Sequence, residues 1–349
     1  MKHLLNTLYV TSDGAYLSKE GDTIVVSVDH EEKLRVPIHI LENIICFGNV
    51  LCTPFFLGLC GKHQVTIAFL SENGHFLGRV HGPVHGNVLL RREQYRRADD
   101  PNSSADIARL IVTAKIANCR AVLLRAARDR PDLPMSTQLT EAGKRLRDLI
   151  ETHPGIANMQ KSISLDSVRG VEGIAASEYF RFFDNLITTQ KDSFFFRGRS
   201  RRPPLDNMNA LLSFLYTILT SDVVSALEGV GLDPAVGFLH RDKPGRPSLA
   251  LDLVEEFRPV IADRLALTLI NRCQVDGADF NTMESGAVVM NEKARKTVLM
   301  AYQERKREEL THPFLKEKIA IGLLPHIQAL LLARHLRGDL NHYPPFFWK

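Results

Sequence analysis

The sequence is poor in cysteine, which limits the kinds of stabilisation and chemistry open to the chain. Five cysteines occur among 349 residues and none forms a CxxC pair: Cys46, Cys52, Cys60, Cys119 and Cys273. A disulfide framework needs a higher density of cysteine, and a zinc or redox motif needs close pairs. We therefore expect a chain that folds without disulfides in a reducing, cytoplasmic environment.

The sequence also lacks a long uninterrupted apolar run. No segment approaches the roughly 18 apolar residues that a membrane span requires, and the opening MKHLLNTLYV has no continuous apolar core of the secretion-signal type. With 44% hydrophobic and 24% charged residues, the composition is that of an ordinary globular protein. We expect a soluble protein without a membrane partner.

Neither sign of charge is in large excess, since the net charge is only +4. The distribution is more informative than the total. Residues 1–95 carry 8 Lys or Arg and 9 Asp or Glu, whereas residues 96–349 carry 36 and 31. The positive excess therefore belongs to the second part, where it permits nucleic-acid binding without establishing it.

The first part of the chain has the pattern of β-strands joined by tight turns. Segments rich in β-branched or aromatic residues lie at Thr7 to Val10, Ala15 to Ser18, Thr23 to Val28 and Val65 to Leu70. The turn dipeptides between such segments are Asp13-Gly14, Gly21-Asp22 and Asn73-Gly74. Because these dipeptides favour tight hairpins, we predict an antiparallel β domain over residues 1–97.

The second part has helical character. Polar residues, a proline and cap-type residues at positions 98–104 indicate a linker followed by a helix start. Apolar residues then recur at helical spacing, and segments rich in Leu, Ala, Glu, Arg and Lys lie at 206–228, 249–270, 291–310 and 316–336. We therefore predict an α+β fold in which an all-α domain over residues 105–349 follows the β domain.

Two segments of the helical part place a metal-competent side chain beside glycine or before a loop. Glu172 lies between Gly170 and Gly173, where backbone can approach a ligand closely and a helix can begin. His240 ends an apolar stretch just before a loop at residues 242–247. Each has a simpler alternative, because the helix dipole favours acids near a helix N-terminus and most histidines are not ligands.

A third segment, SLALDLVEEFRP from Ser248 to Pro259, has a serine suited to capping and apolar residues at helical spacing. Asp252, Glu255 and Arg258 are three residues apart, so they project from neighbouring turns on one side of the helix. Two carboxylates and a guanidinium can then face one pocket. The alternative is an acidic first helical turn at the protein surface.

Carboxylates together with one imidazole suit Mg²⁺ or Mn²⁺ far better than zinc or copper. Such an ion polarises a phosphodiester, activates water or a 3′-hydroxyl and stabilises the leaving oxygen, while a nearby arginine neutralises phosphate charge. The three segments therefore fit phosphoryl chemistry, although their spacing alone does not establish that they meet.

The same segments belong to a set of ordered motifs: GVEGIAASEYF, FRGRSRRPPLDNMNALLSFLY, GFLH and LALDLVEEFRPVIAD. This set closely resembles the CRISPR-associated adaptation endonucleases, and the similarity spans most of the chain. LNTLYVTSDGAYLSKEGDTIVV, GNVLLRREQYR and a helix with Lys115 and Asn118 most resemble the type I-C branch. The resemblance implies an N-terminal β domain that mediates dimerisation and a C-terminal helical catalytic domain, in agreement with the division drawn above.

The resemblance also implies which residues act. The family binds its metal through a Glu, a His and an acidic residue, which correspond here to Glu172, His240 and Glu255. Many relatives have Asp at the last position, so either Glu255 or its neighbouring acid can be the direct ligand. The residues expected to act in catalysis are Glu172, His240, Asp252, Glu255 and Arg258, and Tyr179 and Arg258 match positions expected to contact DNA.

The activity and partners implied by the resemblance go beyond what composition or spacing shows. In that family, two dimers flank a dimer of a small ferredoxin-like partner protein and hold a short DNA fragment. They join its 3′-hydroxyl ends into a CRISPR repeat array by transesterification. We therefore expect a homodimeric, metal-dependent endonuclease and integrase with DNA and this small protein as partners.

The densest basic run is a separate candidate for DNA contact. It consists of Arg197, Arg199, Arg201 and Arg202, with Lys191 upstream. Neutralisation of phosphates is the functional interpretation, and a solvated loop is the alternative. The resemblance favours DNA contact.

Two other functions and one terminal segment stay open. A metal-dependent nuclease for branched DNA, which cleaves without joining spacers, needs the same pocket. A non-catalytic DNA-binding scaffold needs the acids and His240 to be scattered. The closing segment PPFFWK, residues 344–349, cannot be regular helix at its prolines and is either disordered or docked on a partner.

Overall fold

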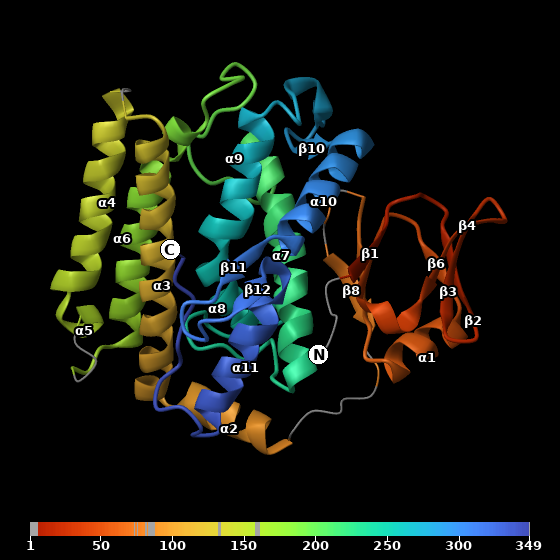
Figure 1. The fold of residues 1–349 in the computed structure, drawn as a ribbon, viewed down its shortest axis with the longest axis horizontal. Coiled ribbons are helices and arrows are strands. Elements are labelled where there is room, and N and C mark those ends of the chain that lie inside the picture. Colours follow the sequence, from red (N-terminus) through yellow and green to blue (C-terminus); the bar gives the residue numbers. More distant parts are fainter. Residues whose placement is uncertain are drawn as a thin grey trace.

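The computed structural model describes residues 6–72, 74, 76–80, 82, 88–131, 134–157 and 161–348. Figure 1 shows a smaller β-rich part formed by the N-terminal sequence beside a larger helical part formed by the rest of the chain. The predicted α+β fold, with an N-terminal sheet region and a C-terminal helical region, is confirmed.

Within the described residues, the N-terminal part contains two four-stranded sheets. The first has the order β1 (Asn6–Val10), β5 (Leu41–Phe47), β7 (Thr66–Leu70) and β8 (Phe76–Val80), and the second has the order β4 (Glu31–Pro37), β3 (Thr23–Val28), β2 (Tyr16–Glu20) and β6 (Leu51–Cys52). Helix α1 (Pro54–Lys62) connects β6 to β7. Side chains from both sheets and from α1 form a common core that includes Leu17, Ile44 and Phe56.

Both sheets are mixed, so the expectation of a purely antiparallel domain was wrong. Strands β1, β5 and β7 are parallel to one another, and β6 is parallel to β2. The turn at Gly21 does connect an antiparallel hairpin, β2 to β3, and this glycine has a φ of +58°. Turn dipeptides reveal such local pairings only, whereas parallel pairs arise through long crossovers that leave no local mark.

The helical part is built around long helices that pack on one another. Its helices are α2 (Val88–Asp99), α3 (Pro101–Asp129), α4 (Pro134–Thr152), α5 (Pro154–Ala157), α6 (Leu165–Arg181), α7 (Asn207–Val230), α8 (Ser248–Phe257), α9 (Arg264–Asn271), α10 (Glu292–Arg307) and α11 (Leu324–Leu336). A π-helix at Arg258–Asp263 continues α8, and short 3₁₀ turns lie at Ile38–Ile40, Phe183–Leu186, Gly277–Asp279 and Ile321–Leu323.

The helical part is not purely α. Among its described residues it also contains two two-stranded ribbons, β9 (Phe280–Thr282) with β10 (Val288–Met290) and β11 (Glu309–Thr311) with β12 (Lys318–Ala320). These strands are three residues long. β9 and β10 lie between the helical segments predicted at 249–270 and 291–310, β11 lies at the end of the second of these, and β12 lies inside the segment predicted at 316–336. The all-α expectation is therefore corrected to a helical domain with short ribbons.

The linker predicted at residues 98–104 is instead the junction of two helices. Helix α2 ends at Asp99 and α3 begins at Pro101, with Asp100 as the N-cap that accepts hydrogen bonds from Asn102 N and Ser103 N. A proline in the first turn and polar cap residues start a helix as readily as they form a loop. Leu90 of α2 belongs to the core of the helical part, so that part already includes α2.

Helix α7 is the central helix of the larger core. In the part of the chain that the structure describes, it is the one helix long and apolar enough to cross a membrane, but 72% of its most apolar window is buried inside the protein. Such burial is typical of a core helix.

The junction between the two parts combines apolar and ionic contacts. The rings of Phe47 in β5 and Phe214 in α7 lie 5.7 Å apart. Lys306 of α10 donates from its buried Nζ to Asp222 Oδ2 of α7 at 2.9 Å and to Thr7 Oγ1 of β1 at 3.2 Å. These contacts attach the first sheet directly to the helical core.

Candidate active site

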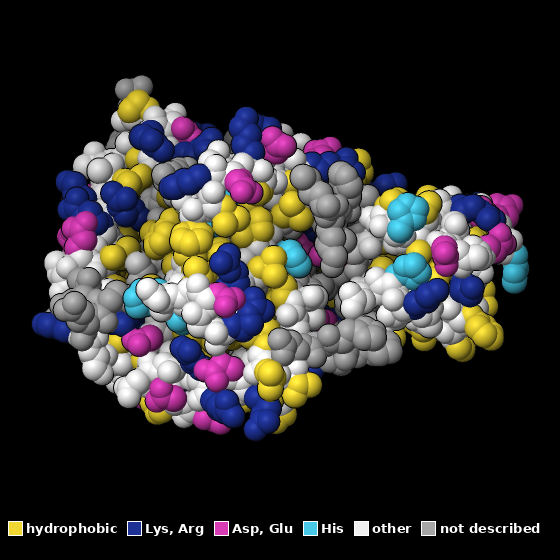
Figure 2. Space-filling model, turned by 60° about the horizontal axis from the view of Figure 1, so that its bottom comes forward, with side chains coloured by type: hydrophobic (Ala, Val, Ile, Leu, Met, Phe, Trp, Pro, Cys, Tyr) yellow, Lys and Arg dark blue, Asp and Glu magenta, His cyan; other side chains and the backbone are white. Residues whose placement is uncertain are grey.

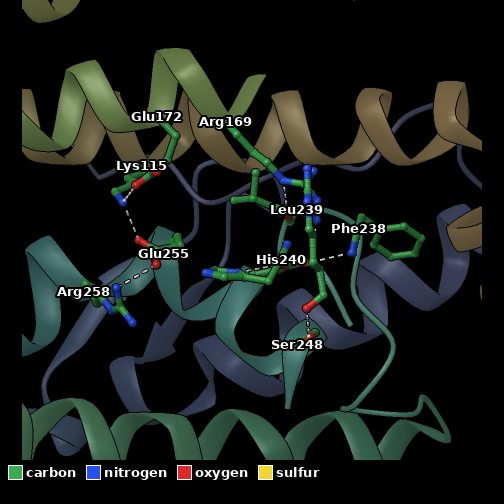
Figure 3. A network of polar contacts seen from close by, with 11 residues as sticks. Lys115, Arg169, Glu172, Phe238, Leu239, His240, Ser248, Glu255 and Arg258 are labelled. Atoms are coloured by element: carbon green, nitrogen blue, oxygen red, sulfur yellow. Dashed lines mark hydrogen bonds and ion pairs between the residues drawn. The ribbon is translucent and has the colours of Figure 1, made fainter. Parts of the chain in front are cut away.

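Three segments meet beside helix α3. Helix α6 carries Glu172, helix α8 carries Asp252 and Glu255, and the loop before α8 carries His240. Figure 3 shows Lys115 of α3 between Glu172 and Glu255, and the His240 ring pointing toward the side on which Glu255 lies. The three predicted segments therefore do come together.

Glu172 does not lie at a helix start. Helix α6 begins at Leu165, where the N-cap Ser164 accepts a hydrogen bond from Ser167 N, so Glu172 lies in the helix interior. Gly170 and Gly173 are exposed residues of the same helix. The interpretation of Glu172 as a first-turn acid that interacts with the helix dipole is therefore excluded, and its carboxylate instead faces Lys115.

Lys115 joins the two carboxylates. Its Nζ donates to Glu172 Oε1 and lies 2.6 Å from Glu255 Oε2. Lys115 is 7% exposed and Glu255 only 3% exposed, so the contact is almost removed from water. The alternative of an acidic surface turn is excluded for α8, because its acids are buried.

Glu255 is held ionised by the cations around it. Burial on its own raises the pKa of this carboxyl, but Arg258 and Lys115 outweigh that effect and lower it to about 2. Arg258 Nη1 donates to Glu255 Oε1 at 2.7 Å. Burial lowers and the carboxylates raise the pKa of Lys115, with a net rise. At neutral pH the carboxylate of Glu255 is therefore charged.

Asp252 binds the backbone and the ring of the His240 segment. Its Oδ2 accepts hydrogen bonds from Phe238 N at 2.6 Å and Leu239 N at 3.0 Å. Its Oδ1 accepts from His240 N at 2.9 Å and lies 2.7 Å from the ring Nδ1. Because Asp252 is fully buried and both of its oxygens are occupied, it orients His240 and does not face the pocket.

The bond to Asp252 also determines which ring nitrogen of His240 is available. A neutral imidazole whose Nδ1–H donates to a carboxylate keeps its lone pair on Nε2. The side chain is 22% exposed, so this nitrogen is not enclosed by the core. Gly237 permits the arrangement, because a Cβ at that position would come within 2.7 Å of Asp252 Oδ2.

Glu172 and His240 line one open pocket of about 390 Å³ together with basic residues. Its other lining residues are Arg169, Leu239, Arg241 and Arg246. Arg169 Nε donates to Leu239 O at 2.8 Å, which ties α6 to the His240 segment. An acidic centre bordered by three arginines can hold a cation and a phosphate side by side.

Sequence reasoning gave no role to Lys115, Arg169, Arg241 or Arg246. Arg169 is one turn before Glu172 and Arg241 follows His240, so both positions carried a usable signal. Lys115 was marked by the family resemblance, together with Asn118, but without a role, and its distance of 57 residues from Glu172 gives no local sign of their contact.

The donor set fits a hard divalent ion. It comprises two carboxylates and an imidazole Nε2, and Glu255 Oε2 is a buried oxygen whose contact among the described residues is the ion pair with Lys115. The ammonium of Lys115 shows that a cation is held between the two carboxylates. Within the described residues, no three His, Cys, Asp or Glu side chains form a preorganised cluster around one point.

The basic run divides into exposed and engaged arginines. Arg197, Arg201 and Arg202 are exposed. Arg199 donates to Asn209 Oδ1 and lies over the Tyr216 ring at 5.0 Å, while Arg258 lies over the same ring at 4.7 Å. Arg199 therefore supports the site internally, whereas the other three are exposed, with Arg197 lying over the Phe195 ring at 4.9 Å.

Tyr179 is enclosed by the core. It is 1% exposed, and its hydroxyl donates to Asp263 Oδ2 at 3.0 Å. A direct contact with DNA does not fit this burial. Tyr179 instead packs α6 against the π-helix that follows α8.

A family model described as CRISPR associated protein Cas1 matches residues 8–304. The chain belongs to the Cas1 family. It is 53% identical over 349 residues to a CRISPR-associated endonuclease Cas1 of Chlorobaculum tepidum and 53% identical over 352 residues to one of Rhodospirillum rubrum, in both cases over the whole length of both chains. The family resemblance is thus confirmed, and the I-C subtype stays a prediction.

Two solved structures share the fold of this Cas1 family member. A CAS1 protein from Thermotoga maritima superposes with a TM-score of 0.79 at 24% identity, covering 99% of this chain and 100% of that chain. A casposase bound to integration product superposes with a TM-score of 0.81 at 23% identity, covering 100% and 95%. The sheet region and the helical region are therefore the known Cas1 architecture.

Proposed function

We propose that this protein is a metal-dependent DNA endonuclease and integrase that joins short DNA fragments into a CRISPR repeat array by transesterification. The observation that carries the proposal is the meeting of Glu172 and Glu255 on Lys115, beside the arginine-lined pocket that Glu172 shares with the oriented His240. The relatives in Chlorobaculum tepidum and Rhodospirillum rubrum are named as endonucleases.

Glu172, Glu255 and His240 Nε2 would hold Mg²⁺ or Mn²⁺. When bound, such an ion supplies Lewis-acid activation of a phosphodiester and stabilises the leaving oxygen. Asp252 keeps His240 in the tautomer with a free Nε2, and Arg258 fixes one oxygen of Glu255. Arg169, Arg241 and Arg246 would neutralise and orient the phosphates beside the acidic centre.

DNA would extend from the pocket over the basic surface of the helical part. On the face shown in Figure 2, basic side chains are spread over this part and interleaved with acidic ones. Arg197, Arg201 and Arg202 are the exposed members of the densest run and would contact phosphates without reading sequence.

We propose a homodimer formed through the β-rich part, with a small ferredoxin-like protein as the further partner, acting in the cytoplasm. Tyr16 and Leu51 are directly paired on β2 and β6 and are 44% and 58% exposed, and Phe55 nearby in sequence is 77% exposed. Apolar surface of this kind is typical of a subunit interface. A Cas6-RT-Cas1–Cas2 complex contains a chain of this fold, with a TM-score of 0.80 at 23% identity, covering 99% of this chain and 36% of that chain.

A nuclease that cuts branched DNA without joining spacers is the second candidate, because it needs the same pocket. Product size separates the two functions. Integration creates a longer, covalently joined product from a labelled fragment and a repeat-bearing plasmid, whereas cleavage produces only shorter strands. A non-catalytic scaffold is disfavoured by the convergence of the acids on Lys115.

The site is tested by Glu172→Gln and Glu255→Gln, with Glu178→Gln as the matched control on α6. Glu178 is also ion-paired, to Arg145 at 2.6 Å, but does not line the pocket. We expect the first two variants to form no joined product while still binding DNA, and the control to behave as wild type. Wild-type joining by folded Glu172→Gln and Glu255→Gln under limiting Mn²⁺ would exclude the site.

A further inference from the structure

The C-terminal segment Tyr343–Trp348 is docked against the back of the candidate active site. Tyr343 and Phe346 are each 1% exposed, and the Phe346 ring lies 6.1 Å from Phe257 at the end of α8. Figure 1 shows the C-terminus beside α3. Of the two expectations for this segment, disorder is therefore excluded for the described residues.

Asn118 of α3 forms hydrogen bonds both to helix α8 and to the C-terminal segment. Its Nδ2 donates to Glu256 O at 2.8 Å and to Phe346 O at 2.9 Å, and its Oδ1 accepts from Trp348 N at 2.7 Å. Asn118 is fully buried and lies one turn after Lys115 on α3. Glu256 O lies where α8 changes into the π-helix, so Asn118 fixes the backbone at that transition.

Glu256 provides the second attachment. Its Oε1 accepts from Tyr343 OH at 2.7 Å, and its Oε2 accepts from Phe346 N at 2.7 Å and from Gln328 Nε2 of α11 at 3.2 Å. Glu256 is fully buried. The preceding residue, Glu255, sends its carboxylate to Lys115 and Arg258, so adjacent acids bind the segment and the pocket respectively.

We propose that the segment Tyr343–Trp348 is a positioning element of the metal site, which fixes Glu255 relative to Lys115 through Glu256 and Asn118. Neither Asn118 nor Glu256 lines the pocket, so both act as positioning residues. The inference rests on the proposed function, because it assigns the segment a role in holding a metal ligand.

The physical reason is the precision that a ligand set demands. A carboxylate must be held within roughly 0.5 Å of its productive position, and loss of an outer partner typically weakens metal binding by about 10- to 100-fold. Glu255 lies three residues before Arg258, where α8 passes into the π-helix and the regular hydrogen-bond ladder of the helix changes. The docked segment restrains the backbone at this transition.

A matched pair of tyrosines tests the proposal in the full chain. Tyr343→Phe removes a buried hydroxyl that donates to Glu256, and Tyr302→Phe removes a buried hydroxyl that donates to Asp222 at 2.9 Å, at the junction of the two parts. Both variants should melt earlier than wild type. Only Tyr343→Phe should also bind Mn²⁺ more weakly, by roughly tenfold, in a titration without DNA.

Asn118→Ala should weaken Mn²⁺ binding further, by roughly 10- to 100-fold. This change removes the hydrogen bonds that hold α8 and the C-terminal segment to α3. Glu256→Gln keeps one acceptor oxygen for Phe346 N and Gln328 Nε2 and can donate from its amide to the Tyr343 hydroxyl, so Mn²⁺ binding should weaken less than in Asn118→Ala. Wild-type Mn²⁺ affinity in folded Tyr343→Phe would overturn the proposal, even if Asn118→Ala fails to fold. If the wild-type protein itself binds no Mn²⁺, the proposed function fails first and this inference with it.

Discussion

Asp252 and Glu255 have different roles because their hydrogen-bonding surroundings differ. Three backbone N–H groups and an imidazole surround Asp252, whereas two cationic side chains surround Glu255. Their spacing in the sequence places both acids on one side of the helix, so it does not show which of them faces the site. Contacts with a loop 12 to 14 residues earlier decide it, and those contacts are tertiary.

Asp252→Asn should therefore impair the orientation of His240 without removing a ligand. An amide accepts at one oxygen only, so backbone N–H groups of residues 238–240 lose acceptors and stability should fall by about 1–3 kcal/mol. Mn²⁺ affinity should fall by about tenfold, whereas joining should be reduced and not abolished as in Glu255→Gln. Urea unfolding and Mn²⁺ titration measure the two effects, and unchanged stability would contradict the assigned bonds.

Mutations in the basic run should have different effects at its exposed arginines and at Arg199, which is held by contacts within the protein. Replacing exposed Arg201 and Arg202 together by Gln should lower the salt slope of DNA binding by about 1 per lost phosphate contact and change stability by less than about 0.5 kcal/mol. Arg199→Gln should lower stability by about 1–3 kcal/mol, because Asn209 Oδ1 loses a charged donor and the Tyr216 ring loses one of its two cations. Fluorescence anisotropy across salt concentrations and thermal melting test this; equal behaviour of the three positions would refute it.

At the scale of elements, the sequence predicted helices better than it predicted their boundaries and the strand pairing. Helical spacing identified α3 and α8, but the predicted capping by Ser248 was wrong: the N-cap of α8 is Pro247, and the Ser248 hydroxyl donates to Arg241 O. The parallel pairing of β1, β5 and β7 depends on crossover connections between the strands. Asp100 and Pro101 are residue types that occur both in loops and at helix starts. Local signals do not distinguish these cases.

Glycines near the site provide a prediction about elements. Gly170→Ala in α6 should raise stability by about 0.5–1 kcal/mol, since a Cβ there contacts nothing within 4 Å among the described residues and alanine favours a helix. Gly237→Ala should lower stability by about 1–3 kcal/mol, because its Cβ would meet Asp252 Oδ2 at 2.7 Å and Leu249 N at 2.9 Å. Denaturant unfolding compares them, and a loss in both variants would contradict the helical environment of Gly170.

At the scale of the whole molecule, the two parts are joined by buried charge as well as by apolar packing. Glu228 of α7 lies 3.9 Å from Arg79 of β8. Burial raises the pKa of Glu228 to about 7, helped by Asp233 and opposed by Arg79 and Arg91. No local pattern in the sequence pairs these residues, because they lie about 150 positions apart.

This junction should make stability depend on pH. The pKa of Glu228 is about 7 in the folded chain and 4.5 in its ordinary state, so folding binds a proton between these values. Its stabilising contribution is complete below about pH 4.5 and is lost as the pH rises to about 7. Compared with Glu228→Gln, the wild type should lose free energy of unfolding between pH 4.5 and about pH 7. Urea unfolding of both proteins at pH 5 and pH 7.5 measures this loss. An equal difference in unfolding free energy between the two proteins at both pH values would refute the prediction.

Under the proposed function, a divalent metal ion would exchange with the ammonium of Lys115 at the two carboxylates. Folding brings Glu172 and Glu255 together with a cation already between them, so their mutual repulsion is offset by the polypeptide itself. Sites without such an internal counterion unfold when a chelator removes their metal. This protein should instead survive chelation with its architecture intact, and it can be emptied and reloaded without passing through the unfolded state.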